Sequence, residues 1–241
     1  MSDLPTLRIL SLYPEDMNIY GDSGNIAALV HRIKLHGLAC EVLAYNIGDV
    51  FPTEIDMIIG GGGQDSGQDR VQTDLQKIAG TIKTLAVDDL PMLVICGLYQ
   101  LFGHEFITND DRLIKGVGLF DITTKAGPER LIGNIVTSSD EFGELIGYEN
   151  HSGLTTFGPK AQPLARVIKG AGNNGHDRSE GVRYRNAIGT YVHGPLLPKN
   201  PRLTDWLIAR AAERAFGAFE PATIDDSLIE STRKIARERP R

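Results

Sequence analysis

A cysteine and a histidine far apart in the sequence have the types and positions that nucleophilic catalysis needs. Cys96 ends a short apolar run that begins at Pro91, and Gly97 follows it. We predict a buried strand here that turns sharply into a helix, because residues 98–104 have a spacing of apolar residues that is compatible with a helix. Such a turn pushes one side chain out of the sheet and aims helix N–H groups at it, which favours a reactive thiolate. The alternative is a small buried hydrophobe at a strand end.

The base that such a thiol needs must come from six histidines. His193 ends the strand-like run 187–193, so it lies at the same edge of the sheet as Cys96 if that strand runs parallel. An imidazole there can take the thiol proton and later protonate a leaving amine. His151 is predicted to lie in a turn at residues 149–153. A histidine that merely ends a strand is the alternative for His193.

A glycine run at residues 60–63 follows a third apolar strand. It is not a dinucleotide-binding fingerprint, because Asp65 stands where the third glycine is needed. Glycines let the backbone approach a ligand closely and present N–H groups, as an oxyanion hole requires. A flexible turn is the alternative.

The elements that must position these groups alternate between strand-like and helix-like patterns. Strands are predicted at residues 7–12, 39–45 and 55–59 and in the run before the cysteine, with helices after the first and third and Asp22 or Ser23 as a helix cap. This order predicts an α/β fold with a mostly parallel sheet covered on both faces, whose ligands bind beyond the carboxyl ends of the strands. Shorter strand-like pieces at 119–123, 131–137, 164–169, 181–185 and 187–193 predict a more antiparallel C-terminal portion of the same sheet system.

Length and composition favour one domain over residues 1–241, with a peripheral amphipathic helix at 224–239. The formal charge of −6, without a cluster of basic and aromatic residues, argues against nucleic acid as a partner. No apolar run approaches the roughly 20 residues that cross a bilayer, and no signal peptide is recognised. Two cysteines, Cys40 and Cys96, are too few for a disulfide framework or a cysteine-based zinc site, and no metal is expected. We therefore expect a cytoplasmic, reduced protein.

Five motifs in order carry a family resemblance. They are YGDSGN at 20–25, GGGGQD at 60–65, CGLYQ at 96–100, RLIGN at 130–134 and YVHGP at 191–195. Together they resemble class I glutamine amidotransferases, and most closely the GatD branch of the cobyric-acid-synthase-like group. The resemblance extends from the first strand to about Gly217. It implies a three-layer, flavodoxin-like sandwich.

The resemblance also implies a glutaminase subunit that hydrolyses L-glutamine. Its ammonia would pass to a MurT-like Mur ligase subunit in a heterodimer, which amidates the D-glutamate of lipid II. ATP and magnesium are expected on that partner, and no cofactor is expected in this chain. Cys96 matches the nucleophile, His193 the base and Arg130 the arginine that holds glutamine, as a guanidinium suits a carboxylate. Backbone N–H groups of Gly62 and Gly97 are the predicted oxyanion donors.

One departure from the class pattern concerns the acid that orients the histidine. Pro195 stands where many class I enzymes carry glutamate, two residues after the histidine. Asp16, Asp22 and Glu149 are candidate acids, but nothing in the sequence places them beside His193. Our hypothesis is that the partner supplies this carboxylate, so that the isolated chain is a poor glutaminase. Two other functions stay open: a stand-alone thiol hydrolase of γ-glutamyl or peptide bonds, and a non-catalytic flavodoxin-like binding module.

Overall fold

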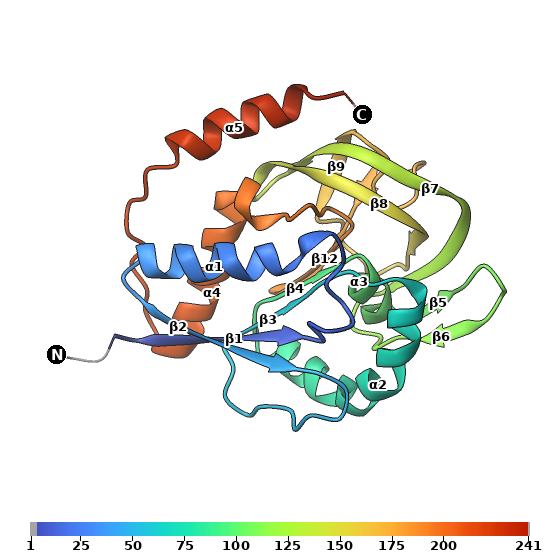
Figure 1. Cartoon of the computed structure of the whole chain (residues 1–241), viewed down its shortest axis with the longest axis horizontal. Helices are drawn as coiled ribbons and strands as arrows, with labels where there is room; N and C mark the ends of the chain where they lie inside the picture. The colour runs from blue at the N-terminus through green and yellow to red at the C-terminus, as the bar shows by residue number, and fades with distance from the viewer. Residues whose placement is uncertain (1–3, 241) are drawn as a thin grey trace.

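A six-stranded sheet, sheet A, forms the centre of the computed structural model, which describes residues 4–240 apart from the side chains of Tyr20 and Asp65 (Figure 1). Its order is β11-β12-β4-β3-β1-β2. The bounds are β1 Thr6–Leu12, β2 Ala39–Tyr45, β3 Met57–Gly60, β4 Met92–Ile95, β11 Val182–Tyr184 and β12 Ala187–Thr190. All neighbours pair in parallel except β11 and β12. The predicted parallel sheet is therefore confirmed.

Helices cover both faces of sheet A, as the α/β pattern predicts. Helices α1 (Ser23–Leu35) and α4 (Pro201–Phe216) pack against each other on one face. Helices α2 (Asp65–Val87) and α3 (Gly97–Phe102) pack together on the other face (Figure 1). Apolar residues at helical spacing face the strands; in α4 they include Leu203, Leu207 and Ala211, all fully buried. Short 3₁₀ turns, η1 (Ile19–Gly21) and η2 (Leu197–Lys199), precede α1 and α4.

A second sheet, sheet B, is built from the segment between α3 and β11. Its order is β10-β9-β7-β5-β6, with β8 paired to β7. The bounds are β5 Glu105–Ile107, β6 Leu113–Lys115, β7 Ile122–Ser139, β8 Gly143–Phe157, β9 Ala165–Lys169 and β10 Ser179–Glu180. The prediction of one continuous sheet system is wrong here, because these strands pair among themselves. An isolated bridge between Tyr148 and His193 connects β8 to the end of β12.

The long hairpin of β7 and β8 contains a bulge that the sequence pattern did not reveal. Its register runs from Ala126 to Leu131 on β7 while β8 moves only from Gly153 to His151. Pro128 lies in this bulge, where its missing N–H breaks no ladder hydrogen bond. His151 therefore lies inside a strand, and its predicted placement in a turn is wrong.

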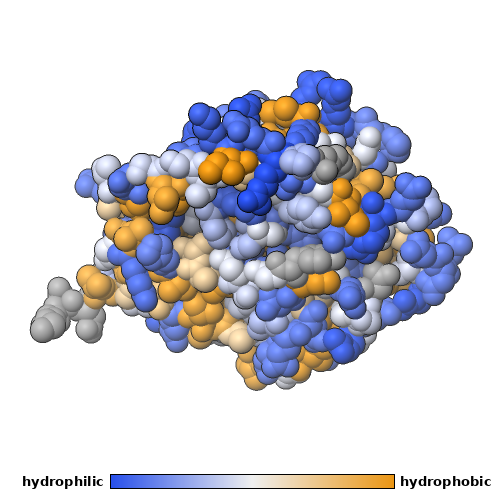
Figure 2. Space-filling view, turned by 45° about the horizontal axis from the view of Figure 1, so that its top comes forward, coloured by the Kyte–Doolittle hydropathy of each residue, from blue (hydrophilic) through white to orange (hydrophobic). Residues whose placement is uncertain are grey.

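Helix α5 (Ser227–Glu238) lies within the predicted range 224–239 and has no buried residue. It lies along the outside of the molecule (Figure 1) and contacts η2 and β8. Arg233 of this helix donates to the Glu144 carbonyl at 2.8 Å. Figure 2 shows a largely hydrophilic face with separate apolar patches, some of them over α5, whose Leu228 and Ile235 are exposed. Within residues 4–240, none of the helices combines the length and apolarity needed to cross a membrane.

Candidate active site

Cys96 stands on the sharp turn between β4 and α3, as the sequence predicts. Its backbone has φ 51° and ψ −105°, a left-handed conformation that a side chain rarely adopts. The Cys96 N–H donates to the Thr190 carbonyl of β12 at 2.9 Å, and its carbonyl accepts from Gln100 N–H at 3.0 Å. Only 8% of the residue is exposed. Backbone strain of this kind costs about 1–3 kcal/mol and is concentrated at functional sites.

His193 lies at the same edge of sheet A, because β12 runs parallel to β4 with Thr190 opposite Ile95. Two backbone hydrogen bonds to Tyr148, of 2.8 and 3.0 Å, hold the histidine just beyond the strand. Burial lowers the pKa of His193 to about 4, although a hydrogen bond to the Asn150 backbone acts in the opposite direction. The imidazole is therefore neutral near pH 7 and able to accept a proton.

Asp22 is the carboxylate that the structure places beside this histidine. Its Oδ1 lies 3.9 Å from His193 Nδ1, and its Oδ2 accepts the Gly62 N–H at 2.6 Å. Asp22 occupies the N-cap position of α1, as the sequence predicts, but its side chain makes no cap hydrogen bond and turns to Gly62 instead. Burial raises the pKa of Asp22 to about 6, and the Gly62 hydrogen bond offsets part of this effect.

The two other acids considered from sequence have different partners. Asp16 pairs with Arg70 at 2.7 Å. Glu149 accepts the N–H groups of Ala171 and Gly172, each at 2.8 Å. Glu149 thus fixes a turn of the chain.

The glycine loop after β3 touches both the thiol and the carboxylate. A methyl group built on Gly62 would come within 3.0 Å of Cys96 Cβ and 3.3 Å of Asp22 Oδ2. A side chain at this position would push against both the cysteine and the carboxylate. The Gly62 N–H, one of the two predicted oxyanion donors, is directed to Asp22. The nitrogen of Gly63, which sequence reasoning did not select, lies 2.9 Å from the place of a methyl group on Gly97. The backbone of Gly63 thus lies close to the backbone of Gly97, the residue after Cys96.

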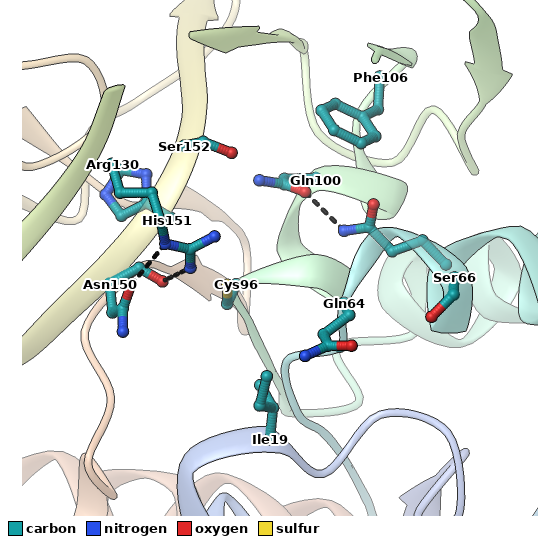
Figure 3. A pocket seen from close by; sticks show the side chains of 12 residues that line it. Ile19, Gln64, Ser66, Cys96, Gln100, Phe106, Arg130, Asn150, His151 and Ser152 are labelled. Carbon is teal, nitrogen blue, oxygen red and sulfur yellow. Dashed lines mark hydrogen bonds between the residues drawn. The ribbon is translucent and has the colours of Figure 1, made fainter. Parts of the chain in front are cut away.

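A cavity of about 370 Å³ opens beside Cys96, and both sheets contribute to its wall (Figure 3). Gln64 and Ser66 come from the start of α2, and Gln100 from α3. Asn150 and Ser152 come from β8. The volume and the polar lining suit a small polar ligand such as an amino acid.

Arg130 reaches this cavity from the bulge of β7, and its guanidinium points inward (Figure 3). Its Nε donates to Asn150 Oδ1 at 2.9 Å, and its Nη2 donates to the Asn150 carbonyl at 3.1 Å. A bulge re-aims a side chain in this way without ending the strand pairing on either side. The guanidinium is placed where it can bind a carboxylate in the cavity.

A chain of polar contacts forms the inner wall of the cavity. Gln68 donates to Gln100 at 2.6 Å, and Gln100 donates to the Tyr191 hydroxyl at 3.1 Å. His151 stacks on the Tyr191 ring at a centroid distance of 3.6 Å. Burial lowers the pKa of His151 to about 3, so it is neutral near pH 7. Sequence reasoning missed this wall, because it predicted His151 to lie in a turn.

The fold, with a cysteine on a strand–helix turn beside a polar cavity, is that of one class of protein, the glutamine amidotransferases. The chain belongs to the CobB/CobQ-like glutamine amidotransferase domain family, whose sequence model matches residues 8–201. The chain is therefore a glutamine amidotransferase enzyme, and the interpretation as a non-catalytic binding module is wrong.

Two relatives are similar over most of the chain. The lipid II isoglutaminyl synthase (glutamine-hydrolyzing) subunit GatD of Staphylococcus aureus (strain N315) is 39% identical over 97% of this chain and 96% of its own length. The subunit of the same name from Streptococcus pneumoniae (strain ATCC BAA-255 / R6) is 35% identical over 88% of this chain and 82% of its own length.

Solved structures support the fold. A crystal structure of a glutamine amidotransferase aligns with TM-score 0.59 and 12% identity, covering 84% of this chain and 98% of that chain. The structure of PurLQS from Thermotoga maritima aligns with TM-score 0.55 and 15% identity, covering 89% and 96%. The predicted class I glutamine amidotransferase fold is confirmed.

Proposed function

We propose that this chain is the glutaminase subunit of a lipid II isoglutaminyl synthase. It hydrolyses L-glutamine in the cytoplasm and passes ammonia to a MurT-like ligase subunit. That partner binds ATP and magnesium and amidates the D-glutamate of lipid II to D-isoglutamine. The observation that carries the glutaminase part is that Cys96 and Arg130 line one and the same cavity. Similarity to the GatD subunits over nearly the whole chain supports the acceptor and the partner.

Glutamine binding begins at the guanidinium. The substrate α-carboxylate takes the two donors that Arg130 otherwise directs to Asn150, in a charge-assisted pair. The side-chain amide then extends toward Cys96 at the base of the cavity. Hydrogen-bonded Gln68 and Gln100 limit the depth of the cavity.

The first chemical step forms a thioester. Neutral His193 accepts the proton of Cys96, and the thiolate attacks the side-chain amide carbon of glutamine. The backbone N–H groups of Gly63, which lines the cavity, and of Gly97, which follows Cys96, hold the negative charge that develops on oxygen. Each such donor contributes roughly 10²–10³ in rate. The imidazolium gives its proton to the departing nitrogen, and ammonia leaves.

The second step releases glutamate. His193 takes a proton from water, which attacks the γ-glutamyl thioester and breaks the carbon–sulfur bond. The proton returns to the cysteine sulfur, so the enzyme ends as it began. Every proton in the cycle moves through the one imidazole.

Replacing the nucleophile tests this proposal. In the complex of this chain with its ligase partner, Cys96→Ala should remove glutamine-dependent amidation by at least about 10⁴-fold. Amidation driven by added ammonium should persist, because the ligase site is on the other subunit. Cys40→Ala is the matched control, since Cys40 lies in β2, away from the cavity.

Loss of the ammonium-driven reaction in Cys96→Ala would show a structural role for the cysteine instead. Glutamate release by the wild-type chain that is not coupled to amidation by any ligase partner would favour the stand-alone thiol hydrolase instead.

A further inference from the structure

The carboxylate of Asp22 is the feature of the site that the proposed reaction does not yet use. The residue is 4% exposed, and its Oδ1 accepts no hydrogen bond from the described part of the chain. A buried carboxylate oxygen without a donor costs free energy, so its presence calls for an explanation. The group facing that oxygen is the His193 ring, with Nδ1 at 3.9 Å.

The position of Asp22 is fixed by contacts on both sides. Its backbone carbonyl accepts the Asn25 N–H at 2.9 Å in the first turn of α1. Its Oδ2 accepts the Gly62 N–H at 2.6 Å. With Oδ2 held by the glycine loop, Oδ1 is directed to the histidine. One carboxylate therefore joins the loop beside Cys96 to the base.

We propose that Asp22 is the positioning residue that orients His193, so that the orienting acid comes from this chain rather than from the partner. This inference rests on the proposed glutaminase function. Asp22 accepts the Nδ1 proton, which leaves Nε2 to accept the thiol proton. When His193 takes the Cys96 proton, the imidazolium and the carboxylate attract each other, and the 3.9 Å separation shortens to a hydrogen bond. Asp22 itself stays ionised throughout.

The matched test is Asp22→Asn against Asp16→Asn, each in the full chain bound to its ligase partner. The asparagine oxygen still accepts the Gly62 N–H, but its amide donates to Nδ1 and stabilises the wrong tautomer of His193. We expect the kcat for glutamate release to fall about 10²–10⁴-fold, with KM for glutamine within about threefold of wild type. Asp22→Glu, which keeps a carboxylate, should recover part of this loss. Asp16→Asn should match wild type, because Asp16 pairs with Arg70.

A pH profile separates orientation from mere support of the fold. Since the pKa of Asp22 is raised to about 6, wild-type kcat should fall as the pH decreases through that value, and Asp22→Asn should lack this acid limb. The other charged groups that act on His193 are Arg130 from β7 and Lys199 from η2. His151 from β8 remains neutral there.

Equal kcat values for Asp22→Asn and Asp16→Asn would overturn the inference, and an acid from the partner would then be the alternative. An Asp22→Asn enzyme that is slow but keeps the wild-type acid limb would also overturn it. If Asp22→Asn fails to fold, Asp22→Glu and the wild-type profile decide the matter. Failure of the glutaminase proposal itself is distinguishable, because Cys96→Ala would then retain glutamine-dependent activity.

Discussion

The two sheets divide the work of the site between them. The carboxyl edge of sheet A carries the groups proposed to transfer protons and form bonds: Cys96 after β4, His193 after β12 and the glycine loop after β3. Sheet B supplies the wall that contacts the substrate, with Arg130 from β7 and Asn150 from β8. Parallel strands fix the first set by register, whereas a bulge and a hairpin fix the second. Different backbone features thus position the groups proposed for chemistry and the groups proposed for substrate recognition.

The largest effect should come from disturbing sheet A at the turn after β4. A methyl group on Gly97 would lie 2.9 Å from Gly63 N and 2.8 Å from both Met17 Cε and Gln68 Nε2. Because the glycine loop must move away, Gly97→Ala should lower kcat for glutamate release about 10²–10³-fold. Gly80→Ala is the control, since Gly80 lies in α2 with open space around it, and it should leave kcat unchanged. Steady-state kinetics of both variants in the complex measure this, and an equal kcat would contradict it.

A smaller and different effect is expected from sheet B. Arg130→Met removes the guanidinium but keeps a similar stem, so KM for glutamine should rise about 10–100-fold while kcat changes little. Arg166→Met on β9 provides the comparison, because Arg166 lines no part of this cavity. If Arg130→Met instead lowers kcat with KM unchanged, the division between chemistry and recognition is wrong.

The smallest expected effect is on the free energy of unfolding, and it concerns Asp22 beside sheet A. Burial raises the pKa of Asp22 from 3.8 to about 6, so the ionised carboxylate opposes folding. The protonated Asp22 carboxyl group stabilises the folded state, and this contribution is complete at acidic pH and is lost as the pH rises through about 6. Asp22→Asn should therefore be more stable than wild type at pH 7 by about 1–2 kcal/mol, with the difference shrinking toward pH 4. Urea unfolding at both pH values tests this, and lower stability of the variant at pH 7 would contradict it.

Sheet A could be predicted from sequence because its signals are local. The apolar runs that become β1, β3 and β4, and the turn at Cys96, each show in a few neighbouring residues. His193 could be placed at the edge of the sheet because a parallel β12 leaves no other position for it. These predictions needed only strand direction and the rule that ligands bind at carboxyl ends.

Sheet B and the acid could not be predicted in the same way. Pro128 within β7 has the pattern of a strand end, so one strand of 18 residues was predicted as separate pieces. The small and polar residues around His151 have the composition of a turn, although β8 continues through them. Asp22 has the sequence pattern of a helix cap, and only the tertiary contacts with Gly62 and His193 show its other use. Long-range contacts decide all three cases.

The bulge at residues 127–130 has an evolutionary consequence. Since β7 and β8 stay paired on both sides of it, residues can be gained or lost there without unzipping the hairpin. Such a change would move Arg130 relative to the cavity and leave Cys96 and His193 in place. Related proteins can in this way acquire new substrates by changing a few residues of the bulge, while the groups proposed to break bonds stay the same.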